Sequence, residues 1–173
     1  MKIYIGIDNG LKGGITVIDE KEKIRDSIVM PITEENKYDL GSIVRFLRNY
    51  IDRSYVNEDE VFITIESASP RPVSGKRACF MTGYGFGAIR GIIEALDMNY
   101  LIVSPNKWMK DLNIVSKEVK GSIAFCEKKY PKYDWKATDR CRIMHDGKTD
   151  SCCIALWCKM NVDAIIKGRE LNK

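Results

Sequence analysis

The feature that most constrains the fold is a series of short apolar runs separated by segments with helical spacing. Residues 2–7 (KIYIGI) place every second isoleucine on one face, which is the period of a β-strand. A glycine-containing turn and the run at 15–19 (ITVID) then predict the second strand of a hairpin. Residues 24–30 (IRDSIVM) predict a third strand, and 61–65 (VFITI) and 100–104 (YLIVS) are typical of buried central strands.

Helical segments alternate with the later strands. Residues 38–51 carry apolar side chains at helical spacing, and 81–97, 117–130 and 149–166 are further predicted helices, whereas 67–80 is a predicted polar loop. Glycines weaken the prediction for 81–97. Strands that alternate with helices run parallel, so the order predicts an α/β fold. We expect a mixed five-stranded sheet, an antiparallel meander followed by parallel strands, with helices on both faces.

The length and composition indicate one domain over residues 1–173. The chain has 173 residues, of which 45% are hydrophobic and 30% charged, as in a globular protein. No apolar run reaches the roughly 18 residues of a membrane span, and no targeting segment is visible, so a cytoplasmic protein is expected. Residues 1–60 hold 9 Lys and Arg against 12 Asp and Glu, whereas 61–173 hold 19 against 12. A basic half points weakly to a polyanionic partner, and on charge alone a solvated, lysine-rich surface is the favoured interpretation.

The cysteines do not indicate a disulfide framework or a zinc site. There are six, with no CxxC pair, and the single histidine, His145, has no paired ligand motif nearby. Without a secretory context we expect reduced and mostly structural thiols.

Four carboxylates follow or begin apolar elements. Asp8 and Glu66 each end a predicted strand, and Asp146 and Asp150 open the last predicted helix in HDGKTD. If that helix begins by Asp146, the two aspartates lie on one face. Converging carboxylates raise one another's pKa values, and a hard divalent cation removes that repulsion. Taken singly, each has another interpretation: a turn residue, a surface charge, a helix cap or a favourable first-turn charge.

These motifs together resemble those of a known family. The first hairpin of the family is resembled by IGIDNGLKGGITVID, and its second acidic motif by ITIES. Its glycine-containing helix is resembled by GAIRGIIEAL, and the strand and basic turn that follow by VSPNKWMK. Its terminal motif is resembled by HDGKTDSCCIALW. In order and spacing they are similar to the RuvC-like Holliday junction resolvases of the RNase H (retroviral integrase) superfamily, especially divergent phage and poxvirus-type members. The resemblance covers nearly the whole chain and implies an RNase H-like fold.

The resemblance implies a structure-selective endonuclease that nicks opposed strands of four-way DNA junctions symmetrically. Asp8, Glu66, Asp146 and Asp150 would hold two Mg²⁺ ions, with Mn²⁺ as a substitute, for two-metal hydrolysis of a phosphodiester. It also implies a homodimer on branched DNA, with no nucleotide cofactor and no membrane partner. Lysines near the scissile phosphate would assist catalysis, and by position these are Lys110 and Lys120. Further DNA contacts are predicted from these residues and from Arg71, Lys76, Arg77, Lys107 and Lys117.

Two positions depart from the family pattern. The last two acidic groups usually lie three residues apart, but Gly147 occupies that position, so the role passes to Asp146, with His145 as the alternative. The family often has an aromatic wedge soon after the second motif, where this chain has Ser67, Ala68 and Ser69. Three aromatic residues farther along could replace it, although core or helix packing is expected for them: Phe80, Tyr84 and Phe86.

Other functions stay open on the sequence alone. A broader debranching or flap nuclease, or an RNase H-type nuclease, would use the same fold. IGIDNG also resembles the first phosphate loop of actin-like sugar kinases and ATPases, but such enzymes need two domains of this type and the chain is too short. A non-catalytic DNA-binding module is the third class, and the retained acidic positions argue against it.

Overall fold

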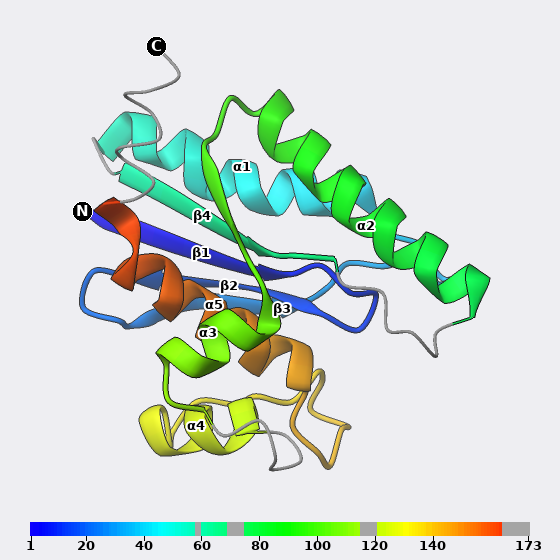
Figure 1. Cartoon of the computed structure of the whole chain (residues 1–173). Helices are drawn as coiled ribbons and strands as arrows, with labels where there is room; N and C mark the ends of the chain where they lie inside the picture. Colours follow the sequence, from blue (N-terminus) through cyan, green and yellow to red (C-terminus); the bar gives the residue numbers. More distant parts are fainter. Residues whose placement is uncertain (58–59, 69–74, 115–120, 164–173) are drawn as a thin grey trace.

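Five strands form one mixed sheet in the order β3-β2-β1-β4-β5 (Figure 1). The computed structural model describes residues 1–57, 60–68, 75–114 and 121–163. The strands are β1 (Lys2–Asp8), β2 (Gly14–Asp19), β3 (Ile24–Val29), β4 (Glu60–Glu66) and β5 (Tyr100–Val103). The meander β1-β2-β3 is antiparallel, whereas β4 joins β1 and β5 joins β4 in parallel. The predicted order and direction of the strands are therefore confirmed.

The parallel pairing of β1 with β4 brings two chain segments with acidic ends together. Ile7 lies opposite Ile65 in this register, so Asp8 and Glu66 end neighbouring strands at the same edge of the sheet. In α/β sheets, the carboxyl ends of parallel strands are where sites form.

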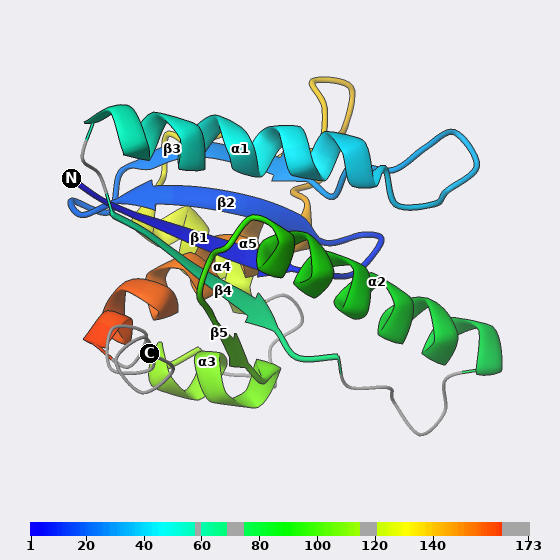
Figure 2. The ribbon, with the colours of Figure 1, turned by 90° about the horizontal axis from the view of Figure 1, so that it is seen from above.

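Helices cover both faces of the sheet. On one face lie α1 (Leu40–Asn57) and α2 (Lys76–Ala95), and on the other lie α3 (Pro105–Asp111), α4 (Gly121–Lys129) and α5 (Asp146–Met160) (Figures 1 and 2). The first turns of α2 extend past the carboxyl ends of β1 and β4 in both views. The expected arrangement, a mixed five-stranded sheet between two helical layers, is what the chain adopts.

Alternating side chains of β1 pack against the helices on opposite faces of the sheet. Ile3, Ile5 and Ile7 pack in the cluster under α1 and α2, whereas Tyr4 belongs to the cluster under α5. Gly6 faces α5 as well, and a Cβ atom there would lie 2.2 Å from Ala155 N and from Ser151 O. The absence of a side chain at Gly6 therefore lets α5 lie directly on the backbone of β1.

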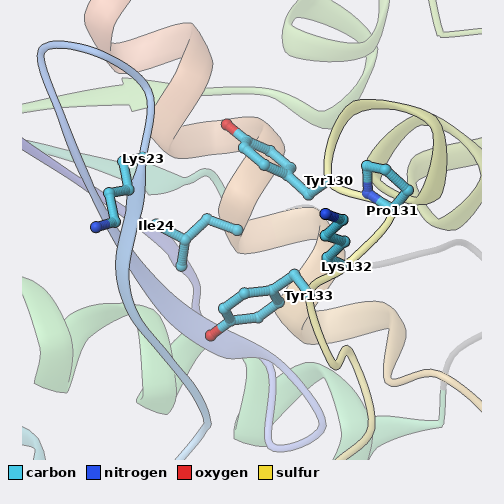
Figure 3. A pocket seen from close by; sticks show the side chains of 6 residues that line it. All are labelled: Lys23, Ile24, Tyr130, Pro131, Lys132 and Tyr133. Carbon is cyan, nitrogen blue, oxygen red and sulfur yellow. The ribbon is translucent and has the colours of Figure 1, made fainter.

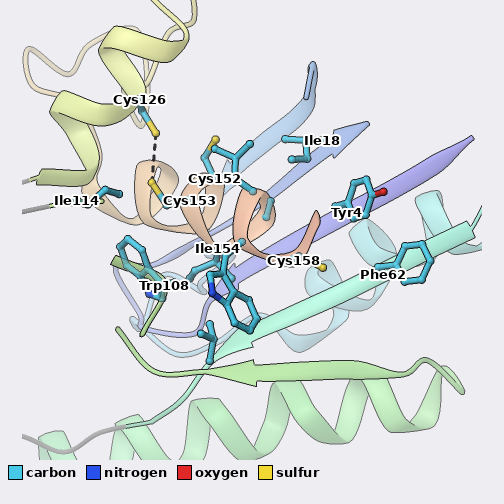
Figure 4. Packing of buried hydrophobic residues seen from close by; sticks show 14 of the residues in the cluster. Tyr4, Ile18, Phe62, Trp108, Ile114, Cys126, Cys152, Cys153, Ile154 and Cys158 are labelled. Atoms are coloured by element: carbon cyan, nitrogen blue, oxygen red, sulfur yellow. Dashed lines mark hydrogen bonds between the residues drawn. The ribbon is translucent and has the colours of Figure 1, made fainter. Parts of the chain in front are cut away.

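The cluster under α5 contains most of the cysteines (Figure 4). Cys126, Cys152, Cys153 and Cys158 are buried, and the Cys126 and Cys153 sulfurs are 3.9 Å apart. They fill the core as small apolar side chains do.

Several helix boundaries differ from prediction. Helix α2 begins at Lys76, inside the predicted loop 67–80, and α5 begins at Asp146, three residues earlier than predicted. The structure adds α3 where a basic turn is expected. Helix α4 falls within the predicted 117–130 segment, whose first residues, through 120, lie outside the described ranges. None of the described helices is long and apolar enough to cross a membrane.

Candidate active site

Four carboxylates from three elements converge at the carboxyl end of the sheet. Asp8 and Glu66 end adjacent strands, and Asp146 and Asp150 lie one turn apart at the start of α5, which packs against β1 and β2. The condition for placing the two aspartates on one helix face, a helix that begins by Asp146, is met. The four predicted carboxylates are therefore brought together.

Burial and mutual repulsion make the two strand-end carboxylates weak acids. Burial is the largest cause that raises the pKa of Asp8, followed by the charges of Glu66 and, to a lesser degree, Asp146. The Gly10 N–H, which donates to Asp8 Oδ1 at 3.1 Å, partly opposes this rise. Burial also raises the pKa of Glu66 most, with a contribution from Asp150.

Asp150 lies in a similar environment on α5. Burial, followed by the charges of Asp8 and Asp146, raises its pKa to about 7, and a hydrogen bond from Ser122 opposes the rise. Three carboxylates that reach the site from β1, β4 and α5 thus share raised pKa values. Such perturbed groups are typical of functional sites.

The start of α5 packs closely against the turn between β1 and β2. Gly147 is buried there, and a Cβ atom on it would lie 2.3 Å from Lys12 O and 2.5 Å from Gly13 Cα. The position three residues before Asp150 therefore has no room for a carboxylate, and the acidic residue Asp146 stands one position earlier, with its side chain exposed. The alternative, His145, stands at the helix N-cap with a pKa lowered by burial, and its buried Nδ1 has no hydrogen-bond partner in the described part of the chain.

Buried hydroxyls hold α5 on the sheet behind the carboxylates. Thr16 Oγ1 lies 2.8 Å from Ser27 Oγ and 2.7 Å from Ser151 Oγ, which joins β2, β3 and α5. Ser151 also donates to the Lys148 carbonyl at 3.0 Å. Because buried hydrogen bonds are costly to break, this network fixes the helix that presents Asp146 and Asp150.

The donor chemistry of the site suits a divalent cation. Within residues 1–57, 60–68, 75–114 and 121–163, no Lys, Arg or His forms an ion pair with any of the four carboxylates. Carboxylate oxygens are the ligands that Mg²⁺ and Mn²⁺ prefer. In the same ranges, no three His, Cys, Asp or Glu side chains are already grouped as ligands of one ion. The residues thus fit a cation in charge and donor type, without forming a completed ligand shell.

Among the described residues, two of the predicted basic side chains lie on an element that extends past the carboxyl end of the sheet. Lys76 and Arg77 are exposed at the start of α2, which extends past the same end of the sheet. Lys110 is exposed on α3, and Lys107 is paired with Asp111 at 2.7 Å. Arg71, Lys117 and Lys120 lie outside the described residues.

Two aromatic side chains on α2 are exposed, contrary to expectation. Phe80 is 69% exposed and Tyr84 45%, and their rings stack with centroids 6.3 Å apart. Core burial is therefore wrong for Phe80, because the first turns of α2 extend past the sheet. The two rings do pack along the helix, and the Tyr84 ring also lies 5.9 Å from the ring of the buried Tyr38. Phe86 does pack partly into the core below α1 and α2.

Some residues of the site carry no signal in the sequence. Trp108 donates its indole N–H to Glu66 Oε1 at 2.8 Å, from α3. The side-chain amide of Asn9 donates to the backbone carbonyl of Glu66. The backbone carbonyl of Asn9 accepts a hydrogen bond from the Tyr38 hydroxyl at 2.8 Å. Lys12 is exposed in the turn beside Gly147. Only Asn9 and Lys12 could have been suspected, because they follow Asp8 closely in the chain.

A separate pocket, drawn in Figure 3, is lined by residues at the other end of the sheet. It has a volume of about 350 Å³ and is lined by Lys23, Ile24, Tyr130, Pro131, Lys132 and Tyr133. Ile24 pairs with Ile18, near the start of β1 and thus away from Asp8 at the end of that strand. None of the four carboxylates lines this pocket.

Solved structures share this fold. No family model and no curated protein sequence matches the chain. RuvC of Thermus thermophilus in complex with a Holliday junction substrate is 12% identical, with a TM-score of 0.61, over 95% of this chain and 96% of RuvC. A second Thermus thermophilus RuvC structure is 13% identical, with a TM-score of 0.59, over 94% and 96%. The yeast mitochondrial Holliday junction resolvase Ydc2 is 16% identical, with a TM-score of 0.57, over 91% and 78%. The chain thus has the RNase H-like fold of the RuvC-type resolvase structures along nearly its whole length.

Proposed function

We propose that this protein is a divalent-metal-dependent endonuclease that cuts branched DNA, with four-way junctions as its preferred substrate. It would act as a homodimer, because two copies related by a two-fold axis match a substrate with paired strands to cut. The observation that carries this proposal is the convergence of Asp8, Glu66, Asp146 and Asp150 at one sheet edge without a cationic partner among the described residues.

The substrate class is supported by the fold and by the surface near the carboxylates. One structure of the same fold is RuvC in complex with a Holliday junction substrate. Here Lys76 and Arg77 offer exposed positive charge for phosphates, and Phe80 and Tyr84 offer exposed rings on which unpaired bases can stack. Unpaired or unstacked bases are available at a branch point and not within a linear duplex.

The four carboxylates would hold two Mg²⁺ or Mn²⁺ ions. When bound, such ions activate a water and stabilise the leaving 3′ oxygen of a phosphodiester, which leaves 5′-phosphate and 3′-hydroxyl ends. The chain's own part is to hold carboxylates from β1, β4 and α5 on rigid supports and to keep them partly out of water. Lys110 and Lys120 are proposed to stabilise the charge that develops on the phosphate.

A broader debranching nuclease is the second candidate. It is favoured by one observation: Ser67 and Ala68, directly after Glu66, supply no aromatic wedge. A flap or RNase H-type enzyme would use the same carboxylates on other substrates.

The test is a substrate panel with Mg²⁺ and, separately, Mn²⁺. The panel holds a labelled immobile four-way junction, a flap, a fork, a linear duplex and an RNA–DNA hybrid. We expect paired nicks in opposed strands of the junction, little cleavage of the linear duplex, and loss of all cleavage on adding a chelator. Light scattering of the same sample should give about twice the 19.8 kDa of the chain.

Equal cleavage of every branched substrate would move the function to the debranching nuclease. Cleavage of the hybrid alone would indicate an RNase H-type enzyme. Cleavage that survives the chelator would contradict the metal dependence.

A further inference from the structure

Helix α3 reaches the candidate active site through one tryptophan. Trp108 is 2% exposed, and its Nε1–H donates to Glu66 Oε1 at 2.8 Å. Among the described residues this is the one hydrogen bond that the Glu66 carboxylate accepts. The indole lies in the core against α5 (Figure 4), so its orientation is fixed by packing.

The other end of α3 is tied to the helix that carries the remaining carboxylates. Asp111 Oδ2 accepts from Trp157 Nε1 of α5 at 2.7 Å and is paired with Lys107 Nζ at 2.7 Å. Helix α5 begins with Asp146 and carries Asp150 in its second turn. Helix α3 is therefore held between the end of β4 and α5, two of the three elements that contribute carboxylates to the candidate site.

We propose that Trp108 is a positioning residue that fixes the Glu66 carboxylate for cation binding. A glutamate side chain has three rotatable bonds, and a hydrogen bond from a rigid buried donor limits the orientations that it samples. The bond uses one carboxylate oxygen, and within the described residues the other oxygen accepts no hydrogen bond. This inference rests on the proposed function, because it concerns the same set of carboxylates.

Two substitutions separate this role from packing. Trp108→Phe keeps an aromatic ring in the core and removes the N–H that reaches Glu66. Trp135→Phe is the matched control, because Trp135 lies in the same buried cluster, is 1% exposed, and its Nε1 has no hydrogen-bond partner among the described residues. Both variants lose the same atoms, but only the first loses a contact with the site.

The experiment is titration calorimetry of Mn²⁺ into the DNA-free protein. We expect Trp108→Phe to weaken Mn²⁺ binding by about 10- to 100-fold, as is typical for loss of a group that orients a metal ligand. Trp135→Phe should change it by less than about twofold, and both variants should bind a four-way junction in EDTA like the unchanged protein. Junction cleavage by Trp108→Phe should recover as Mn²⁺ is raised. In a Glu66→Gln background, Trp108→Phe should cause no further loss of Mn²⁺ affinity.

A second measurement needs no change at Trp108. The indole N–H resonance of Trp108 in ¹⁵N-labelled protein should shift on adding Mg²⁺, more than that of Trp135, and this response should disappear in Glu66→Gln.

The outcomes distinguish the two proposals. Suppose that the unchanged protein binds Mn²⁺ and cuts junctions. The role of Trp108 alone would then be overturned if Trp108→Phe bound Mn²⁺ with the same affinity, or if the Trp108 indole N–H resonance did not respond to Mg²⁺. An unchanged protein that neither binds Mn²⁺ nor cuts branched DNA would overturn the proposed function and this inference with it.

Discussion

At the scale of single residues, the half-buried carboxylates Asp8, Glu66 and Asp150 make the stability of the protein depend on pH. The pKa of Asp150 is about 7 in the fold, against about 4 for an exposed aspartate. Between these values the folded state binds more protons than the unfolded state, so the free energy of unfolding falls as pH rises through that window. The loss of stability caused by ionised Asp150 is complete at pH values above the pKa of Asp150 in the folded state.

Asp150→Asn should therefore stabilise the metal-free protein at pH 8 and have little effect at pH 4. We expect the Tm at pH 8 to rise by roughly 2–4 °C for each kcal/mol of burial cost and repulsion that the substitution removes. The measurement is thermal unfolding in EDTA at both pH values. Asp52→Asn, at an exposed position on α1, is the matched control and should leave the pH response unchanged. An identical pH response in Asp150→Asn and the unchanged protein would contradict the electrostatic account of the site.

Gly147 supports a second prediction at this scale. An added Cβ atom would lie within 2.5 Å of backbone atoms of the β1–β2 turn, so Gly147→Ala must displace that turn or α5. We expect a loss of about 1–3 kcal/mol in the free energy of unfolding, as for other overpacked sites. Gly91→Ala, in open space on α2, should instead be neutral or stabilise by up to about 1 kcal/mol. Urea unfolding of both variants checks this, and a neutral Gly147→Ala would show that the turn is not closely packed.

At the scale of elements, the first turns of α2 combine exposed rings with positive charge. Because Phe80 is 69% and Tyr84 45% exposed, replacing both with alanine should lower the Tm only slightly, through loss of the contact between Tyr84 and Tyr38. Loss of base stacking should weaken junction binding by about 1–3 kcal/mol per base, measured by fluorescence anisotropy in EDTA. Met160→Ala, an equally exposed apolar position at the end of α5, should leave junction binding unaffected. Unchanged binding by the double variant would remove α2 from the DNA contact.

Elements with a strong internal period were predictable from the sequence, and short or tertiary-dependent ones were not. The hairpin, β4 and α1 follow from apolar spacing over many residues. Helix α3 has seven residues, too few for a helical period to show, and begins at Pro105. The start of α2 was missed because its first turns extend past the sheet and so bury few side chains.

The carboxylates of the candidate site were predictable because Asp8 and Glu66 end strands, Asp146 begins a helix, and Asp150 follows four residues later on the same face. The residues that hold these carboxylates in place were not predictable from the sequence. Trp108 lies 42 residues from Glu66 in the chain, and the contact depends on where α3 packs in the fold. Gly147 is a similar case. The sequence shows a glycine where the resembled family has an acidic residue, and only the packing of Gly147 against Lys12 and Gly13 explains why a side chain is absent there.

At the scale of the whole molecule, the features that support a nuclease share one end of the sheet. The carboxylates, the exposed rings of α2 and its basic first turn lie there, whereas the pocket beside Tyr130 and Tyr133 lies at the other end. In the proposed function, α2 and its surroundings would hold the DNA, and the carboxylates at the same end of the sheet would be where it is cut.

The most direct test of this central claim is to measure cleavage and binding of the same four-way junction by Asp8→Asn. A cation at such a site contributes several kcal/mol to the reaction, and about 1.4 kcal/mol corresponds to a tenfold rate change. We therefore predict that cleavage in Mg²⁺ falls by at least about a thousandfold, whereas the junction Kd in EDTA stays within about threefold of the unchanged protein. Asp52→Asn should alter neither. Cleavage that persists in Asp8→Asn, or junction binding that is lost together with cleavage, would contradict the account.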